Sequence, residues 1–91
     1  MFVARKFLIS GFVQGVGFRF FTQRSAARYQ VRGYVRNLED GRVEALAEGD
    51  ERAVKDFMED LATGPTYARV DEIEEIVLEP GGSFSSFLIE R

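Results

Sequence analysis

The stretch GFVQGVGFR, Gly11–Arg19, joins two segments with different hydrophobic patterns. Residues 3–13 alternate loosely and carry apolar side chains in both sets of positions, which predicts a mostly buried strand. Gly15 and Gly17 then interrupt this pattern. From Phe18 to Tyr29 the apolar residues recur at helical spacing, which predicts a core face of Phe18, Phe21, Ala26 and Tyr29 with Gln23, Arg24 and Arg28 facing outward. The stretch is therefore predicted to end a strand, form a glycine-rich loop and begin a helix.

The chain has 91 residues, of which 45% are hydrophobic, so we expect a single domain over residues 1–91 with a genuine core. It contains no cysteine and no histidine, and its formal net charge is −3. A negative balance is unfavourable for broad binding to nucleic acids or anionic membranes. No apolar run is long enough to cross a bilayer and the N-terminus lacks a signal-peptide pattern. We therefore expect a soluble, cytoplasmic protein, and a monomer.

The remaining elements are indicated by turn and capping residues. Asp40-Gly41 predicts a hairpin turn between two strands. Asp50 is a natural N-cap for a strongly amphipathic helix, which Gly64-Pro65 ends. The expected strands are 3–13, 31–37, 42–49, 68–80 and a short terminal strand within 84–91, and the expected helices are 18–29 and 51–63.

This order, β-α-β-β-α-β with a last short strand, predicts the fold class. Right-handed crossovers around a hairpin produce a ferredoxin-like α+β sandwich. Its sheet is mainly antiparallel, and both helices cover one face. This fold hosts many unrelated functions, so it assigns none by itself.

The chemistry available to the chain is narrow. Without histidine or cysteine there is no imidazole base, thiolate nucleophile or metal site built from these residues. The glycine loop can be read in two ways. In one reading Gly15 and Gly17 only shape a turn and Arg19 is a surface cation; in the other the loop amides and the helix dipole hold an anion that Arg19 binds. The local pattern leaves both readings open.

Asn37 is the second polar candidate, because it ends the strand 31–37 beside the hairpin. It is either a turn-flanking residue or an amide that faces the glycine loop and orients water. Arginine and asparagine without a base suit an acyl phosphate, whose carboxylate leaving group needs no proton at neutral pH. Positioning and charge neutralisation then supply most of the catalysis.

Two motifs resemble those of the acylphosphatase family. GFVQGVGFR fits the pattern G-x-V-Q-G-V-x-F-R, and GYVRN, Gly33–Asn37, fits a second pattern, G-[aromatic]-V-x-N. Similarity also extends through GRVEALAEGD and GPTYARVDEI to the terminal FLIE. The resemblance therefore covers nearly the whole chain.

The resemblance implies a ferredoxin-like hydrolase that cleaves acyl phosphates to a carboxylate and inorganic phosphate without metal or cofactor. It implies that Arg19 binds the phosphoryl group, that Asn37 orients the attacking water, and that a phosphate oxygen of the substrate accepts the water's proton. The implied substrate-binding residues, through their backbone amides, are Gln14, Gly15, Val16, Gly17 and Phe18.

Two alternatives remain open at this stage. An RNA-binding module of the same fold is suggested by RGYV, Arg32–Val35, which partly matches the RNP1 pattern. The other alternative is an acylphosphatase-like domain that handles carbamoyl phosphate, as in larger hydrogenase-maturation enzymes. The expected partners of the favoured function are a small acyl phosphate and inorganic phosphate, with no nucleic acid and no membrane.

Overall fold

The computed structural model describes residues 1–91 and contains five strands and two helices. All predicted elements are present, and only their ends differ. The last strand is shorter than its apolar sequence predicts, since it spans three residues. In chain order the elements are β1 (Phe2–Phe12), α1 (Phe18–Tyr29), β2 (Arg32–Asn37), β3 (Val43–Asp50), α2 (Glu51–Thr63), β4 (Arg69–Leu78) and β5 (Phe87–Ile89).

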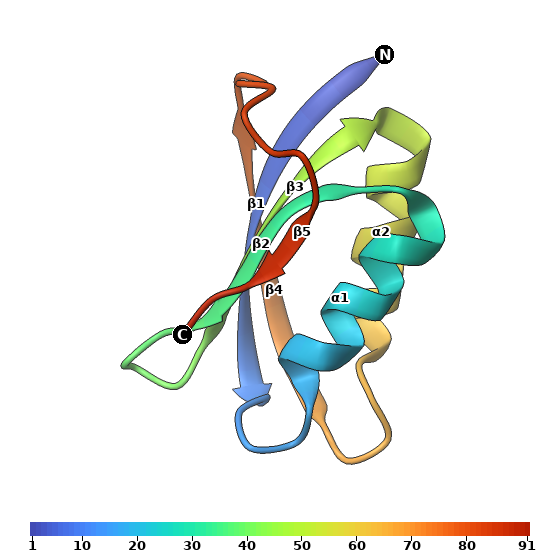
Figure 1. Cartoon of the computed structure of the whole chain (residues 1–91). Coiled ribbons are helices and arrows are strands. Elements are labelled where there is room, and N and C mark those ends of the chain that lie inside the picture. Colours follow the sequence, from blue (N-terminus) through green and yellow to red (C-terminus); the bar gives the residue numbers. More distant parts are fainter.

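The strands form one mixed sheet in the order β4-β1-β3-β2-β5. β1 pairs antiparallel with β3 and β4, β2 pairs antiparallel with β3, and only β5 runs parallel to its neighbour β2. Figure 1 shows both helices on the same side of this sheet, with the β1–α1 loop at one end. The predicted ferredoxin-like sandwich with a short fifth strand is confirmed.

The core lies between the helices and one face of the sheet. Phe57 of α2 is fully buried and packs against Phe7 of β1 and Phe87 of β5, with ring centroids 6.3 and 5.7 Å apart. The prediction that β1 is buried on both faces is wrong at Phe12, which is 56% exposed. The reason is the layer arrangement, because no element covers the second face of the sheet as the helices cover the first.

The buried stripe of α1 is more polar than the sequence suggests. Thr22 and Ser25 are buried, whereas Phe21, expected on the core face, is only partly buried. Both hydroxyls are satisfied, since Thr22 Oγ1 donates to the Phe18 carbonyl at 2.8 Å and Ser25 Oγ to Asp60 Oδ2 at 2.7 Å. Burial is tolerated when a polar group has a partner.

α2 follows its sequence signals closely. The Asp50 side chain accepts a hydrogen bond from the Arg52 backbone N–H at 3.1 Å, which is the predicted N-cap. Val54, Phe57 and Leu61 are buried on one stripe. Gly64 ends the helix, so both predicted boundary signals are confirmed.

On the face away from the helices, a three-residue cluster joins β2 to β3. Tyr34 Oη donates to Glu44 Oε2 at 2.5 Å, and Arg36 Nε lies 3.2 Å from the same oxygen. Burial of the phenol, with the adjacent Glu44 carboxylate, raises the pKa of Tyr34 to about 12. Burial acts to raise the pKa of Glu44 too, but the hydrogen bonds from Tyr34 and Arg36 outweigh it and hold that pKa below its usual value. The cluster holds in place the strand that ends at Asn37.

This cluster predicts a specific alkaline titration. The difference in tyrosinate absorbance between wild type and Tyr34→Phe should have its midpoint near pH 12, and Glu44→Gln should move it toward 10. Because the folded-state pKa is raised, the stability that Tyr34 contributes is complete below pH 10 and is lost as the pH rises toward 12. A wild-type midpoint near 10 would contradict the assignment of this hydrogen bond.

Gly33 predicts a second effect, on stability, since β2 and β3 approach very closely there. A Cβ at this position would lie 1.8 Å from the Leu46 carbonyl oxygen, and the backbone φ is +146°. We expect Gly33→Ala to lower the free energy of unfolding in urea by about 3 kcal/mol or more. Gly41→Ala is the matched control, because its φ is also positive but no atom lies within 4 Å. It should cost about 1 kcal/mol, and equal costs for the two variants would refute the steric explanation.

Candidate active site

The loop between β1 and α1 is built on two glycines with left-handed backbone angles. Gly15 has a φ of +77° and Gly17, the N-cap of α1, a φ of +76°. A Cβ added at either position would meet no atom within 4 Å. The glycines are therefore required by backbone conformation rather than by crowding, and the space in front of the loop is open.

The backbone N–H groups of this loop have no acceptor within the chain. The first amide of α1 to donate a helical hydrogen bond is that of Phe21, to the Gly17 carbonyl at 3.0 Å. The preceding amides, from Gln14 to Phe20, donate to neither a backbone nor a side-chain oxygen. No side chain caps the helix and its first turn holds no acidic residue. Such a group of free donors at a helix N-terminus favours a bound anion.

Arg19 lies in the first turn of α1 and is oriented by the end of the chain. Its Nη1 donates to the backbone carbonyl of Glu90 at 3.1 Å. That carbonyl belongs to the residue after β5, whose N–H in turn donates to the Val35 carbonyl of β2 at 2.8 Å. One guanidinium nitrogen is thus held by the protein, and the side chain remains partly exposed to solvent.

Asn37, at the end of β2, lies in the same cavity as Arg19 and the glycine loop. The cavity measures about 220 Å³ and is lined by Val13, Gly15, Gly17, Phe18, Arg19, Phe20, Asn37 and Ile89. An adjoining hollow is lined by Arg19, Asn37, Ile89 and Arg91. The structure therefore brings together five of the seven residues singled out from the sequence.

The other two, Gln14 and Val16, do not line this cavity. The Gln14 side chain points to the β2–β3 hairpin, where Nε2 donates to the carbonyls of Leu38 and Arg42 at 2.8 and 2.9 Å. It thereby ties the glycine loop to the turn that follows Asn37. Val16 lines a neighbouring cavity between the helices instead. Only the backbone amides of these two residues remain candidates for contact with an anion.

The contact of Arg19 with Glu90 was not predicted from the sequence. The acceptor is a backbone carbonyl, which every residue type offers, so no side-chain pattern could have indicated it.

No cluster of three or more aspartate, glutamate, histidine or cysteine side chains could hold a metal ion. Neither helix has the length and hydrophobicity needed to cross a bilayer.

Comparison with known proteins agrees with this geometry. The family model "Acylphosphatase" matches residues 5–89. An acylphosphatase from Moorella thermoacetica is 48% identical over 80 residues, covering 88% of this chain and 86% of that protein. One from Actinobacillus succinogenes is 45% identical over 89 residues, covering 98% and 99% of the two chains.

Solved structures show the same relationship. The crystal structure of acylphosphatase from Bacillus subtilis superimposes with a TM-score of 0.94 at 36% identity, covering 98% of this chain and 99% of that one. Full-length HypF, solved in a phosphate- and nucleotide-bound form, matches with a TM-score of 0.89 at 29% identity, although this chain corresponds to only 12% of it. The chain therefore belongs to the acylphosphatase family of hydrolases.

Proposed function

We propose that this protein hydrolyses the carboxyl–phosphate anhydride of acyl phosphates to a carboxylate and inorganic phosphate, and that neither a metal nor a cofactor takes part. The observation that carries the proposal is the cavity in which Arg19, Asn37 and the glycine loop meet. Membership of the acylphosphatase family supports it.

The phosphoryl group would bind against the free amides of the loop from Gln14 to Phe18, with Arg19 beside it. The amides point partial positive charge at one place, and the guanidinium adds a full charge with a forked set of donors. Since Nη1 of Arg19 is already held by Glu90, its other donors are left for the phosphoryl oxygens. A preorganised site of this kind stabilises the charge of the transition state without reorganisation.

Asn37 would hold the attacking water on the side of the phosphorus opposite the leaving group. The water oxygen forms a bond to phosphorus as the bond from phosphorus to the acyl oxygen breaks. The water's proton passes to a phosphoryl oxygen of the substrate, and the electron pair of the broken bond leaves with the carboxylate. This route needs no side-chain base, which suits a chain without histidine.

The RNA-binding alternative has less support. Domains of that kind bind bases on the open face of the sheet, which in this protein carries the buried carboxylates Glu44 and Glu48. The charge of Glu44 is matched by Arg36, but Glu48 has no basic partner, and its unmatched negative charge opposes a phosphate backbone. A carbamoyl phosphate is itself an acyl phosphate, so the second alternative concerns only the identity of the acyl group.

Two substitutions separate binding from turnover. Arg19→Ala should lower kcat with benzoyl phosphate by about a thousandfold and also weaken inhibition by inorganic phosphate. The reason is that the substitution removes both the positive charge and the guanidinium hydrogen-bond donors. Asn37→Ala should lower kcat by about a hundredfold while phosphate inhibition stays near the wild-type level. Assays run with a chelator present address the proposed independence from metal.

Arg52→Ala is the control, since this arginine is exposed on α2 and pairs only with Asp56. It should retain wild-type kinetics. A wild-type protein that hydrolyses no acyl phosphate would overturn the proposed function, and loss of phosphate inhibition in Asn37→Ala would overturn the division of roles.

The role of the chain end gives a further prediction. Deletion of residues 90–91 removes the carbonyl that orients Arg19, so we expect kcat/KM for benzoyl phosphate to fall about tenfold. Glu90→Gln keeps the backbone carbonyl and should leave kcat/KM within about twofold of wild type. A loss in Glu90→Gln equal to that of the deletion would show that the side chain, not the carbonyl, is responsible.

A further inference from the structure

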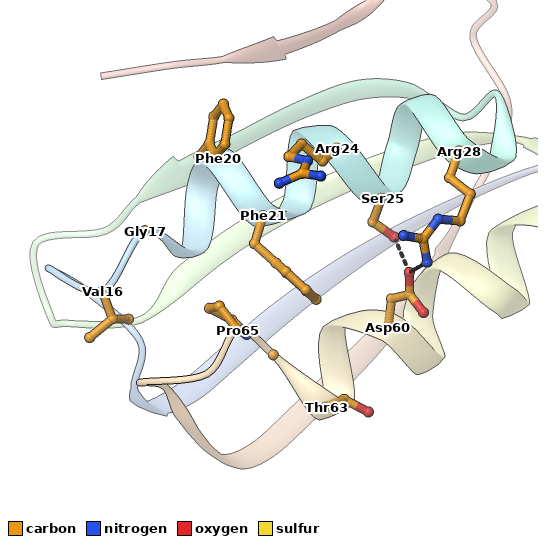
Figure 2. A pocket seen from close by; sticks show the side chains of 11 residues that line it. Val16, Gly17, Phe20, Phe21, Arg24, Ser25, Arg28, Asp60, Thr63 and Pro65 are labelled. Carbon is orange, nitrogen blue, oxygen red and sulfur yellow. Dashed lines mark hydrogen bonds and ion pairs between the residues drawn. The ribbon is translucent and has the colours of Figure 1, made fainter.

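A second cavity, of about 540 Å³, lies between α1 and α2 beside the candidate active site. Figure 2 shows residues of α1 and α2 that line it, with Val16 and Gly17 at the end nearest the loop. Gly17 and Phe20 line both this cavity and the one that contains Arg19 and Asn37. The two cavities therefore adjoin at a shared wall, and a group that extends from the loop toward Phe20 lies next to the second cavity.

The lining of this second cavity carries a net positive charge. It contains the guanidinium groups of Arg24 and Arg28 and one carboxylate, that of Asp60. Asp60 already has partners, since Ser25 Oγ donates to its Oδ2 at 2.7 Å and Arg28 Nη1 lies 3.5 Å from the same oxygen. The charge of Asp60 is thus largely matched by Arg28.

Arg24 has no carboxylate partner anywhere in the chain. Its guanidinium carbon lies 5.8 Å from the centroid of the Phe20 ring, so the cation is placed against the wall that the two cavities share. A guanidinium that lies against an aromatic ring is held in a fixed orientation, and the N–H donors in its plane remain free to bind an anion.

The reach from the glycine loop to Arg24 suits a small acyl group. Arg24 is seven positions after Gly17 in the sequence, which corresponds to about 10 Å along the helix axis. Helical side chains lean back toward the helix N-terminus, which shortens the distance to the guanidinium. A carboxylate or second phosphate carried on the far side of a small acyl group can span such a gap.

We propose that the cavity between α1 and α2 is an acyl-group subsite in which Arg24 selects acyl phosphates that carry a second anionic group. This proposal rests on the proposed function, because it assigns the acyl portion of the same substrate. Phe20 provides the apolar surface along which the acyl group lies, and Arg24 binds its distal anion.

The test compares 4-carboxybenzoyl phosphate with its neutral isostere, 4-carbamoylbenzoyl phosphate. The rigid ring keeps the distal group away from the anhydride, so the two substrates differ at the distal charge only. Arg24→Gln should lower the ratio of kcat/KM for the charged substrate to that for the neutral one by about fivefold, the effect of one partly exposed ion pair. The effect should appear as a higher KM for the charged substrate. For the neutral substrate, kcat/KM should change by less than about twofold.

Arg52→Gln removes the same charge from α2 at a position about 12 Å along the helix from Asp60. It is the matched control and should leave the ratio unchanged. An unchanged ratio in Arg24→Gln, or an equal fall in Arg52→Gln, would overturn the subsite while leaving the proposed function intact. Wild-type protein that hydrolyses neither substrate would overturn both.

Discussion

The loop amides from Gln14 to Phe20, which have no acceptor inside the chain, are the constraint on which the site depends. Backbone N–H groups normally have a hydrogen-bond partner, and this consecutive run of donors has none within the chain, so its partner must come from solvent or from a ligand. The fold supports this run from both ends. β1 ends at Phe12, shortly before the run, and the last donors of the run belong to the first turn of α1, which also contributes its dipole.

The groups around these amides come from segments far apart in the sequence, and each is fixed by a contact with another segment. Gln14 ties the loop to the hairpin after Asn37, and the Glu90 carbonyl holds Arg19. The parallel pairing of β5 with β2 places that carbonyl. The geometry of the site is therefore determined by the register of the strands. Arg19 and Asn37, the two side chains with proposed roles, depend on it for their positions.

Much of this could be predicted from the sequence, because the decisive signals are local. Asp50 and Gly64 mark the ends of α2, and Asp40-Gly41 marks the hairpin, through backbone preferences that need no tertiary context. The proximity of Asn37 to the glycine loop could be predicted from topology, because β1 and β2 run in the same direction on either side of β3 and so end at the same edge of the sheet.

The remaining features depend on contacts that have no pattern in the sequence. The exposure of Phe12 depends on which face of the sheet the helices cover. The burial of Thr22 and Ser25 depends on acceptors supplied by Phe18 and Asp60. The cavity between the helices exists only once α1 and α2 are packed, so Arg24 looked like an ordinary outward-facing cation in the sequence.

The hydrogen bond from Arg19 to the backbone carbonyl of Glu90 also affects how the protein folds. It spans 71 positions of a 91-residue chain, and β1, which lies between β4 and β3, is paired on both sides only after both of these later strands have formed. Long-range contacts carry a large loop-closure entropy before they add stability, which slows folding. The carbonyl that orients Arg19 follows β5 directly, so the guanidinium is held in place only after β5 has paired with β2.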